Sequence, residues 1–374
     1  MLYYLYLLAE YSEEAQPELL KGFNVFQYIT FRALAAGVTA FLLSLIFGNW
    51  MIRHLISLKL GQPIRTQEEV HKLYELHGSK AGTPTMGGLL LLGAVLVSTF
   101  LWARPTNPLV WLALFSVVYL GVLGFVDDYL KVTKKSSDGI SSRLKFTLQC
   151  VLAAVITGFL AWEPSLELHW SELYVPFYKE PIIHNMGIFA FFLYLFVIVG
   201  TSNAVNLTDG LDGLAAGCTV TTAFTFALIT YAAGNIKIAT YLQIPFVQFS
   251  GELAVVCMAL VGASLGFLWW NCHPARVFMG DTGSLAIGGL LGVVAIAAKQ
   301  ELLLALIGGV FVLEAGSVIL QVASFKLTGR RIFKMSPIHH HFELSGWKES
   351  TVIVRFWILS IIFALLGLAT LKLR

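Results

Sequence analysis

Long apolar runs alternate with short polar segments along nearly the whole chain. A bilayer core about 30 Å thick needs roughly 20 apolar residues for one helical crossing. Ten runs approach or exceed that length, and they predict an all-α polytopic membrane protein with about ten transmembrane helices. The predicted spans are approximately residues 23–50, 85–103, 108–127, 144–162, 187–205, 213–233, 251–270, 284–298, 302–327 and 351–371.

Composition agrees with this pattern. Of the 374 residues, 57% are hydrophobic and 13% are charged, which lies outside the range of soluble domains. We therefore predict a single integral membrane domain over residues 1–374. The ninth run contains Gly308, Gly309 and Gly316, and we expect that helix to tilt or bend.

Positive charge is distributed unevenly between the two ends of the runs. Of the 25 Lys and Arg residues, 17 lie in or beside the loops that follow the first, third, fifth, seventh and ninth helices. Such residues stay on the cytoplasmic side, so these loops are predicted to be cytoplasmic and both termini periplasmic. On the periplasmic side, alternation over residues 165–170, followed by residues 174–177, predicts a small β-hairpin. The four cysteines form neither a disulfide framework nor a zinc-ligand spacing, and we interpret them as packing residues.

Two adjacent carboxylates end the third run. Asp127 and Asp128 are followed by Lys131, Lys134 and Lys135. A charged side chain costs about 2.5 to 3.5 kcal/mol at the centre of a membrane helix and less near its ends. The pair could form a solvated helix end, with Asp127 offset by Lys131 one turn later. Alternatively, the carboxylates could bind a metal ion while the neighbouring lysines bind a phosphate.

Further polar side chains follow the fifth run and precede the eighth. A turn would account for the Asn, Asp and Gly residues after the fifth run, but the spacing of Asp209 and Asp212 places both on one helical face with Asn206 nearby, as ligands would be. Before the eighth run, Phe278 offers a ring for stacking and Asp281 a carboxylate for a divalent ion.

Helix starts add positive potential to the same side of the membrane. Thr83 and Pro84 predict the N-cap and first residue of the second helix. The partial positive charge of that helix end, together with Lys80, would attract an anion. Glu314, within the ninth run, is expected to be buried against a partner in the bundle.

Three consecutive histidines form the last polar feature. His339, His340 and His341 follow Ser336 and Pro337, which predict another cap and first helical turn. The imidazoles could form a chance metal-binding tract. They could also point from a helix N-terminus toward the shared cytoplasmic face.

Carboxylates, helix N-termini, a lysine and imidazoles gathered on one face indicate phosphoryl transfer. That chemistry depends on neutralising and positioning phosphate groups. The donor would be water-soluble and approach from the cytoplasm, the acceptor would be a lipid phosphate, and no nucleic acid is expected. A secondary transporter, the alternative from another class, would place its polar residues near the membrane midplane in broken helices.

Four segments resemble the signatures of one family: Gly124–Tyr129, Asn206–Gly213, Phe278–Ser284 and Met335–Glu343. They are similar to the bacterial phospho-N-acetylmuramoyl-pentapeptide transferases (the MraY family). This family belongs to the polyprenyl-phosphate N-acetylhexosamine-1-phosphate transferase superfamily. The first three segments occur more loosely across that superfamily, whereas the triple histidine favours this branch over a sibling that uses UDP-GlcNAc. The resemblance covers essentially the whole chain.

The resemblance implies a Mg2+-dependent reaction of UDP-MurNAc-pentapeptide with undecaprenyl phosphate, giving lipid I and UMP for peptidoglycan synthesis. It also implies a homodimer in the bacterial inner membrane, in contact with membrane lipid, with the active site on the cytoplasmic face. The resemblance further implies that Asp281 binds Mg2+ and that Asp127 and Asp128 act on the lipid phosphate or the metal. Asp209 would bind substrate, and Phe278, Asn206 and Asp212 would hold the uridine. Contacts with the diphosphate or its sugar would come from Lys80, His339, His340 and His341.

Overall fold

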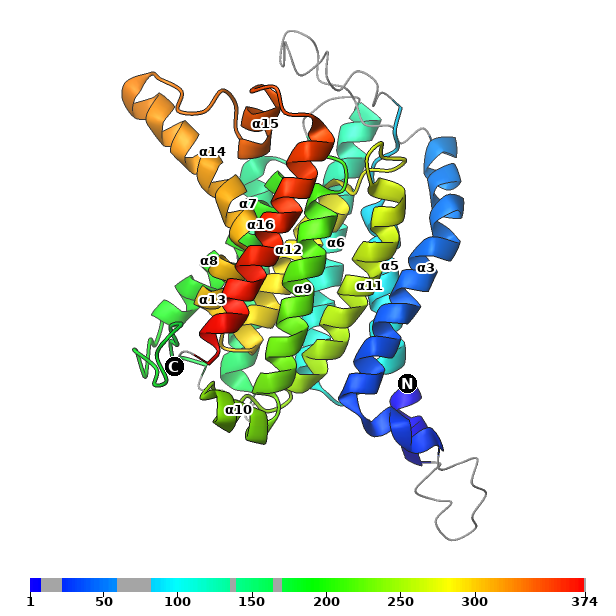
Figure 1. Ribbon diagram of the computed structural model, residues 1–374, viewed down its shortest axis with the longest axis vertical. Coiled ribbons are helices and arrows are strands. Elements are labelled where there is room, and N and C mark those ends of the chain that lie inside the picture. The colour runs from blue at the N-terminus through cyan, green and yellow to red at the C-terminus, as the bar shows by residue number, and fades with distance from the viewer. Residues whose placement is uncertain (8–21, 59–81, 135–138, 164–169, 373–374) are drawn as a thin grey trace.

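The computed structural model describes residues 1–7, 22–58, 82–134, 139–163 and 170–372, which form an elongated helix bundle (Figure 1). In this part of the chain, nine helical segments are long and apolar enough to cross a membrane, and Gly88–Trp102 is a shorter apolar helix. All ten predicted spans therefore correspond to helices. The elements are η1 (Leu2–Leu5), η2 (Gly22–Gln27), α3 (Ile29–Ser57), α5 (Gly88–Trp102), α6 (Pro108–Lys134), α7 (Ser142–Trp162), α8 (Phe189–Thr208), α9 (Leu214–Ala233), α10 (Ile236–Leu242), η5 (Ser250–Glu252), α11 (Leu253–Asn271), α12 (Gly280–Ala297), α13 (Glu301–Ile307), α14 (Gly309–Thr328), α15 (Ile338–Glu343) and α16 (Glu349–Thr370).

Helix α12 forms the centre of the bundle, packed between α6 and α8. Of its residues, 89% are buried, which is why the run reads as hydrophobic on every side. Gly288 lets the backbone of α8 approach closely, because a Cβ at this position would overlap the carbonyl of Thr201. The close packing fixes Gly280, the first residue of α12, at one end of the bundle.

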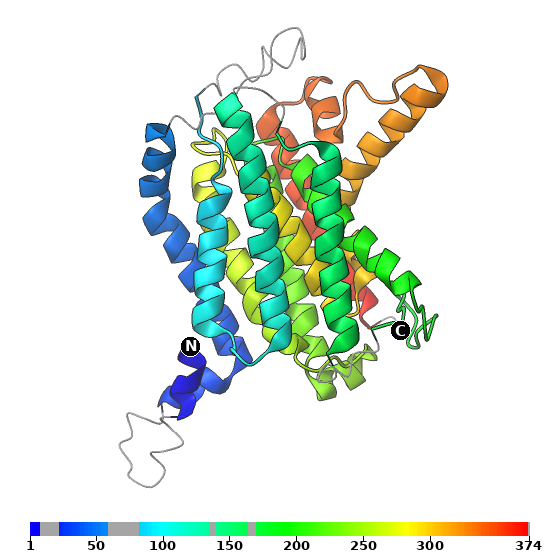
Figure 2. The same cartoon turned by 180° about the vertical axis from the view of Figure 1, so that it is seen from behind.

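The ninth predicted span is broken. Helix α13 ends at Ile307, Gly308 lies between the two helices, and α14 begins at Gly309. Helix α14 then leans away from the bundle axis, as both views show (Figures 1 and 2). Large apolar side chains such as Ile319 and Leu327 are exposed on it, as expected for a helix that contacts lipid. The predicted bend at the glycines is confirmed.

Both ends of the described chain lie at the end of the bundle opposite α15 (Figure 1). A buried ion pair joins α3 to η5 at that end, with Arg32 Nη2 2.6 Å from Glu252 Oε1. The first part of the predicted hairpin, residues 165–169, lies outside the described residues, so the hairpin stays a prediction. After them, Leu173 and Ile183 form an isolated antiparallel bridge. Which side of the membrane each end faces stays a prediction.

The predicted start of the second helix at Thr83 and Pro84 is wrong. Helix α5 begins at Gly88, and the residues before it pair with the segment that precedes α12. Phe278 N–H donates to the Pro84 carbonyl (2.9 Å), and Gly87 N–H donates to the Phe278 carbonyl (2.8 Å). Gly88 N–H donates to Met279 in the same way (2.9 Å). These amides are therefore already bonded and do not form the predicted anion site.

Candidate active site

Three helix ends meet at the end of the bundle that also carries α15 (Figure 1). They are the C-terminal turns of α6 and α8 and the first turn of α12. Helix α6 continues about two turns beyond Asp127, so the acidic pair lies within the helix and not at its end. Asp127 and Asp128 are only 2% and 5% exposed. The solvated helix end of the sequence alternative is therefore wrong, whereas its pairing of Asp127 with Lys131 is confirmed.

Two lysines bridge the carboxylates of Asp127 and Asp281. Lys131 Nζ lies 2.6 Å from Asp127 Oδ2 and 3.1 Å from Asp281 Oδ2. Lys145 Nζ lies 2.6 Å from the same Asp281 oxygen and 3.7 Å from Asp127 Oδ2. The two ammonium groups thus share two carboxylates that come from opposite sides of the site. Lys145 comes from the first turn of α7.

Asp128 has a different environment although it is the next residue. Its Oδ2 accepts hydrogen bonds from the backbone N–H (2.9 Å) and the hydroxyl (2.7 Å) of Thr282. Its Oδ1 accepts from Asp281 N–H at 3.2 Å. Because the first amides of a helix lack partners within the helix, Asp128 serves as a cap for α12 supplied by α6. Gly280 has a φ of 74° at this point, a value that favours glycine.

The three carboxylates are arranged so that they could hold a metal ion. One oxygen from each of Asp127, Asp128 and Asp281 lies within 4.8 Å of the others. Carboxylate oxygens are the ligands that Mg2+ takes from proteins, usually one or two of them with water and substrate phosphate. Asp128 is held by the backbone N–H groups that begin α12, whereas Asp127 and Asp281 are paired with lysine ammonium groups, which a cation could replace, so these two are the better candidates. The donor set fits a magnesium ion.

Asn206, in the last turn of α8, is engaged with the same cluster. Its Nδ2 donates to Asp281 Oδ1 at 2.7 Å and to Ser284 Oγ at 2.8 Å. Asp281 is therefore held by an amide on one oxygen and by the two lysines on the other. Asn206 is part of the carboxylate support in this structure, and the uridine contact expected for it stays a prediction.

Asp209 and Asp212 do not share a helical face, because α8 ends at Thr208 and both residues lie in the turn before α9. Asp209 faces the start of α12. Burial, together with the negative charges of Asp281 and Asp128, raises the pKa of Asp209 to about 7. The predicted pairing of Asp209 with Asp212 is thus wrong.

Asp212 belongs to a second cluster. Its Oδ2 accepts from Ala275 N–H at 3.0 Å and lies 3.1 Å from His273 Nδ1. Its own N–H donates to Glu349 Oε1 at 3.1 Å. Asp212, His273 and Glu349 also place ligand atoms within 4.8 Å of one another. These contacts fasten the α8–α9 turn to the loop before α12 and to the start of α16.

The three histidines point to three different partners. His339 is fully buried, with Nδ1 3.0 Å from Glu314 Oε2 on α14. The burial of Glu314 against a bundle partner is confirmed. His340 Nδ1 lies 2.8 Å from Glu343 Oε2, and His341 Nδ1 accepts from the N–H of Lys334 (3.1 Å). The three Nδ1 atoms are thus engaged separately.

Helix α15 starts one residue later than predicted. Pro337, in extended conformation, occupies the N-cap position, and no side chain caps the helix, which begins at Ile338. Ser336 therefore is not the cap. On the other side of His339, Gly210 lies against the imidazole Nε2. His339 thus connects the α8–α9 turn to α14.

Phe278 is half-buried immediately before α12, and the backbone pairing described above fixes it beside the start of α5. Lys80 lies outside the described residues. The sequence interpretation missed Lys145, His273 and Glu349 as parts of these clusters. Lys145 carried a usable signal, because a lysine in the first turn of a helix meets the positive end of the helix dipole and needs an acidic partner.

Comparisons with known proteins place the chain among the transferases. Residues 110–299 match the family model described as glycosyl transferase family 4. Residues 80–92 match phospho-N-acetylmuramoyl-pentapeptide-transferase signature 1. The chain is 52% identical over 374 residues to a phospho-N-acetylmuramoyl-pentapeptide-transferase from Methylacidiphilum infernorum (isolate V4), and the alignment covers 100% of both proteins.

Proposed function

This chain belongs to the phospho-N-acetylmuramoyl-pentapeptide-transferase family, and we propose that the acidic end of its helix bundle carries the transferase site. The chain transfers phospho-MurNAc-pentapeptide from UDP-MurNAc-pentapeptide to undecaprenyl phosphate, giving lipid I and UMP for peptidoglycan synthesis. Our assignment of this reaction to particular residues rests on one observation. Asp127 and Asp281 share the ammonium groups of Lys131 and Lys145 at the point where three helix ends meet.

The reaction exchanges one phosphoanhydride for another. An oxygen of the lipid phosphate attacks the phosphorus that carries MurNAc, the bond to the UMP phosphate breaks, and UMP leaves with the electron pair. The second pKa of a phosphate monoester is near 6, so the lipid phosphate is already a nucleophile at neutral pH and needs no general base. Catalysis then depends on positioning and on neutralising charge.

We assign the neutralising charges to Lys131, Lys145 and a magnesium ion held by Asp281 with Asp127. When bound, the ion would neutralise negative charge on the phosphate groups. The lysines would move from the carboxylates to phosphate oxygens as substrate enters, because an ammonium group can change partners over this short distance. Asn206 keeps Asp281 oriented during this exchange through its bond to Oδ1.

A direct attack by the lipid phosphate suits these side chains better than a covalent enzyme intermediate. Asp128 accepts three hydrogen bonds from the first turn of α12, which makes it a poor nucleophile. Asp127 is bound to Lys131 at 2.6 Å and accepts from Ile140 N–H at 2.8 Å. We therefore propose a single displacement in which Asp127 orients the acceptor phosphate or the metal.

The donor is proposed to lie across the start of α12, toward α15. Phe278 supplies a ring beside the uracil, Asp212 lies at the uridine end, and Asp209 binds substrate between them. Lys80, His339, His340 and His341 would contact the diphosphate or its sugar. We place this face in the cytoplasm at the bacterial inner membrane, where a water-soluble nucleotide donor is available. A homodimer is part of the same proposal.

UMP release is the test of the reaction and of its donor. Purified protein with undecaprenyl phosphate and Mg2+ should release UMP from UDP-MurNAc-pentapeptide and form lipid I. UDP-GlcNAc serves as the matched control, because the sibling transferases use it. Release of UMP from UDP-GlcNAc, with none from UDP-MurNAc-pentapeptide, would contradict the proposed donor site.

A further inference from the structure

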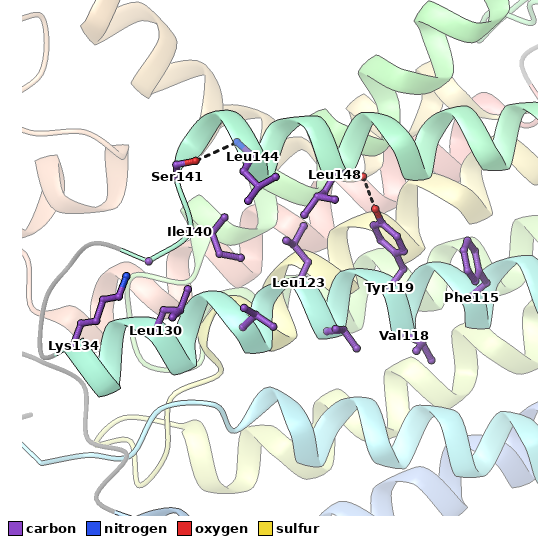
Figure 3. Close-up of a pocket in the computed structure, with 13 residues that line it drawn as sticks. Phe115, Val118, Tyr119, Leu123, Leu130, Lys134, Ile140, Ser141, Leu144 and Leu148 are labelled. Atoms are coloured by element: carbon purple, nitrogen blue, oxygen red, sulfur yellow. Dashed lines mark hydrogen bonds between the residues drawn. The ribbon is translucent and has the colours of Figure 1, made fainter.

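Helix α7, which carries Lys145, lies at the edge of the bundle. Of its apolar stretch, 33% of the residues are buried, compared with 89% for α12. On the side toward α6, Leu144 and Leu148 border an open apolar cavity of about 740 Å3 (Figure 3). Beyond this cavity, the Tyr119 hydroxyl on α6 donates to the Leu148 carbonyl at 3.0 Å. Packing against α6 therefore does not by itself fix the end of α7 that carries Lys145.

Gln149 begins the buried stripe of α7, one turn after Lys145, and is 1% exposed. The stripe continues, at the spacing of three and four residues that one helix face produces, with the buried residues Leu152, Ala153, Ile156, Thr157 and Leu160. A buried amide without partners costs free energy. A glutamine at this position therefore needs hydrogen bonds where an apolar residue would need none.

Both polar atoms of the Gln149 amide have partners on α8. Its Nε2 donates to Ser202 Oγ at 3.2 Å, and its Oε1 accepts from Asn203 Nδ2 at 3.0 Å. Ser202 Oγ in turn donates to the Leu285 carbonyl on α12 at 3.1 Å. Gln149 thus connects α7 to α8 directly and to α12 through Ser202.

These contacts join the same three helices that meet in the site, one helical turn deeper in the bundle. Gln149 lies four residues after Lys145 on α7, and the carbonyl reached on α12 lies four residues after Asp281. On α8, Ser202 precedes Asn206 by four residues as well. The charged contacts of the site therefore lie on a second layer of neutral hydrogen bonds between α7, α8 and α12.

The second layer restricts the rotation of α7. Helices α8 and α12 are held close together at Gly288, so they form a frame to which α7 is attached. Lys145 must extend from α7 into this frame, where its Nζ lies 2.6 Å from Asp281 Oδ2. A rotation of α7 by one residue would turn Lys145 about 100° away. A buried polar residue within an apolar stripe is a known way to fix the register of packed helices.

We propose that Gln149 is a positioning residue for the transfer reaction, because it fixes the rotation and register of α7 at which Lys145 reaches Asp281. This inference rests on the proposed transferase function, in which Lys145 neutralises phosphate charge. Gln149 is buried one turn below the site and acts through the lysine, without contact with substrate.

Gln149→Met tests this role, since methionine has a similar length and forms neither hydrogen bond. The partners keep bonds of their own, because Asn203 Nδ2 also donates to a carbonyl of its own helix (2.8 Å) and Ser202 keeps its bond to α12. The fold should therefore persist, which the melting temperature in detergent checks. Thr157→Val is the matched control, because Thr157 lies in the same buried stripe and its hydroxyl donates to a carbonyl of α7 itself (2.8 Å).

For Gln149→Met we expect the kcat for UMP release to fall about tenfold, with the KM for UDP-MurNAc-pentapeptide close to the wild-type value. Thr157→Val should keep both. The loss should vanish in a Lys145→Met background, because the effects of residues that act through one another are not additive. Wild-type kcat in Gln149→Met, or the same loss in both backgrounds, would overturn the proposal.

Ser202→Ala removes the bridge from the side of α8 and provides the test if Gln149→Met does not fold. It should lower kcat in the wild-type background and have no further effect when Lys145 is already methionine. An equal loss from Ser202→Ala in both backgrounds would likewise contradict a role through the lysine.

A labelling experiment separates this inference from the transferase function. The Lys145 side chain is 17% exposed and bound by two carboxylates. Reductive methylation followed by mass spectrometry should modify Lys145 several times faster in Gln149→Met than in the wild type or Thr157→Val. An unchanged rate would overturn the proposal even in an active enzyme. If the rate rises as expected but wild-type protein releases no UMP with any donor, the proposed function fails and the placement of Lys145 by Gln149 stands.

Discussion

Asp128 on α6 and Thr282 on α12 are joined by two hydrogen bonds to one carboxylate oxygen, from the Thr282 backbone N–H (2.9 Å) and hydroxyl (2.7 Å). The first turn of the central helix is thus capped from a neighbouring helix. Asp127, one residue earlier, faces Lys131 and the amide of Ile140 instead. Adjacent residues on a helix point about 100° apart, and here this separates a supporting carboxylate from one that is available to ligands.

Asp128→Asn should lower stability as well as turnover. The substitution removes a negative charge from a helix N-terminus and one of the acceptors that cap it. We expect a loss of about 1 kcal/mol in the free energy of unfolding, measured as a lower melting temperature in detergent. Asp127→Asn is the control and should lose turnover with a much smaller shift. Equal shifts in the two variants would show that Asp128 does not cap α12.

Asp281→Asn should weaken the Mg2+ dependence of turnover more than it lowers the stability of the fold. Asp281 is supported by Asn206 and both lysines, and the Asn side chain can keep the amide contact while it loses the charge. We expect UMP release to fall about 100-fold or more and its dependence on Mg2+ concentration to weaken. A chelator should abolish wild-type turnover. Wild-type turnover and unchanged Mg2+ dependence in the variant would remove Asp281 from the site.

The three histidines should respond unequally to alanine. His341 Nδ1 accepts from the backbone of Lys334, which leaves only Nε2 for the proposed contact with the donor, and we expect that contact to contribute little. His341→Ala should loosen a loop and leave turnover within about threefold, which corresponds to less than about 1 kcal/mol. His339→Ala and His340→Ala should lose about 100-fold, with the proteins still folded. Metal analysis should find no zinc, because structural zinc requires four ligands in a tetrahedral arrangement. Stoichiometric zinc, or normal turnover in all three variants, would show that the motif has another role.

The native Cys272 allows the membrane topology to be tested by chemical labelling. It is exposed in the loop before α12, whereas Cys218 and Cys257 are buried and Cys150 is half-buried. An impermeant maleimide should label the protein in inverted membrane vesicles and fail to label it in intact spheroplasts. Cys272→Ser should remove the labelling. Labelling of intact spheroplasts that depends on Cys272 would place the site on the periplasmic face.

The helices could be predicted from sequence because each membrane crossing must satisfy its own backbone hydrogen bonds. Local patterns were misleading where distant segments pair. Thr83 and Pro84 carry a strong local helix-start signal, yet Pro84 accepts a hydrogen bond from Phe278, and this tertiary pairing delays the helix. The Asp209 and Asp212 spacing likewise suggested a helix, but the two residues occupy a turn.

The composition of the acidic cluster was predicted, but its internal connections were not. Asp127, Asp128 and Asp281 were all expected in the site, because carboxylates at helix ends on one side of a membrane have few other uses. The sequence could not show that Asp128 caps α12 or that Lys145 reaches Asp281, since these contacts span 154 and 136 positions. Only the packing of α6 against α12, with α7 packed against α6 and α8, brings them together.

Because the helix breaks at Gly308, α14 forms an arm that is attached to the bundle at its N-terminal end. Glu314, which contacts His339, lies six residues beyond Gly308, about 9 Å along the helix, whereas Thr328 lies about 30 Å away. A rotation about Gly308 would therefore displace the far end of α14 roughly three times as far as Glu314. The carboxylate that anchors His339 would therefore move only about a third as far as the end of the arm.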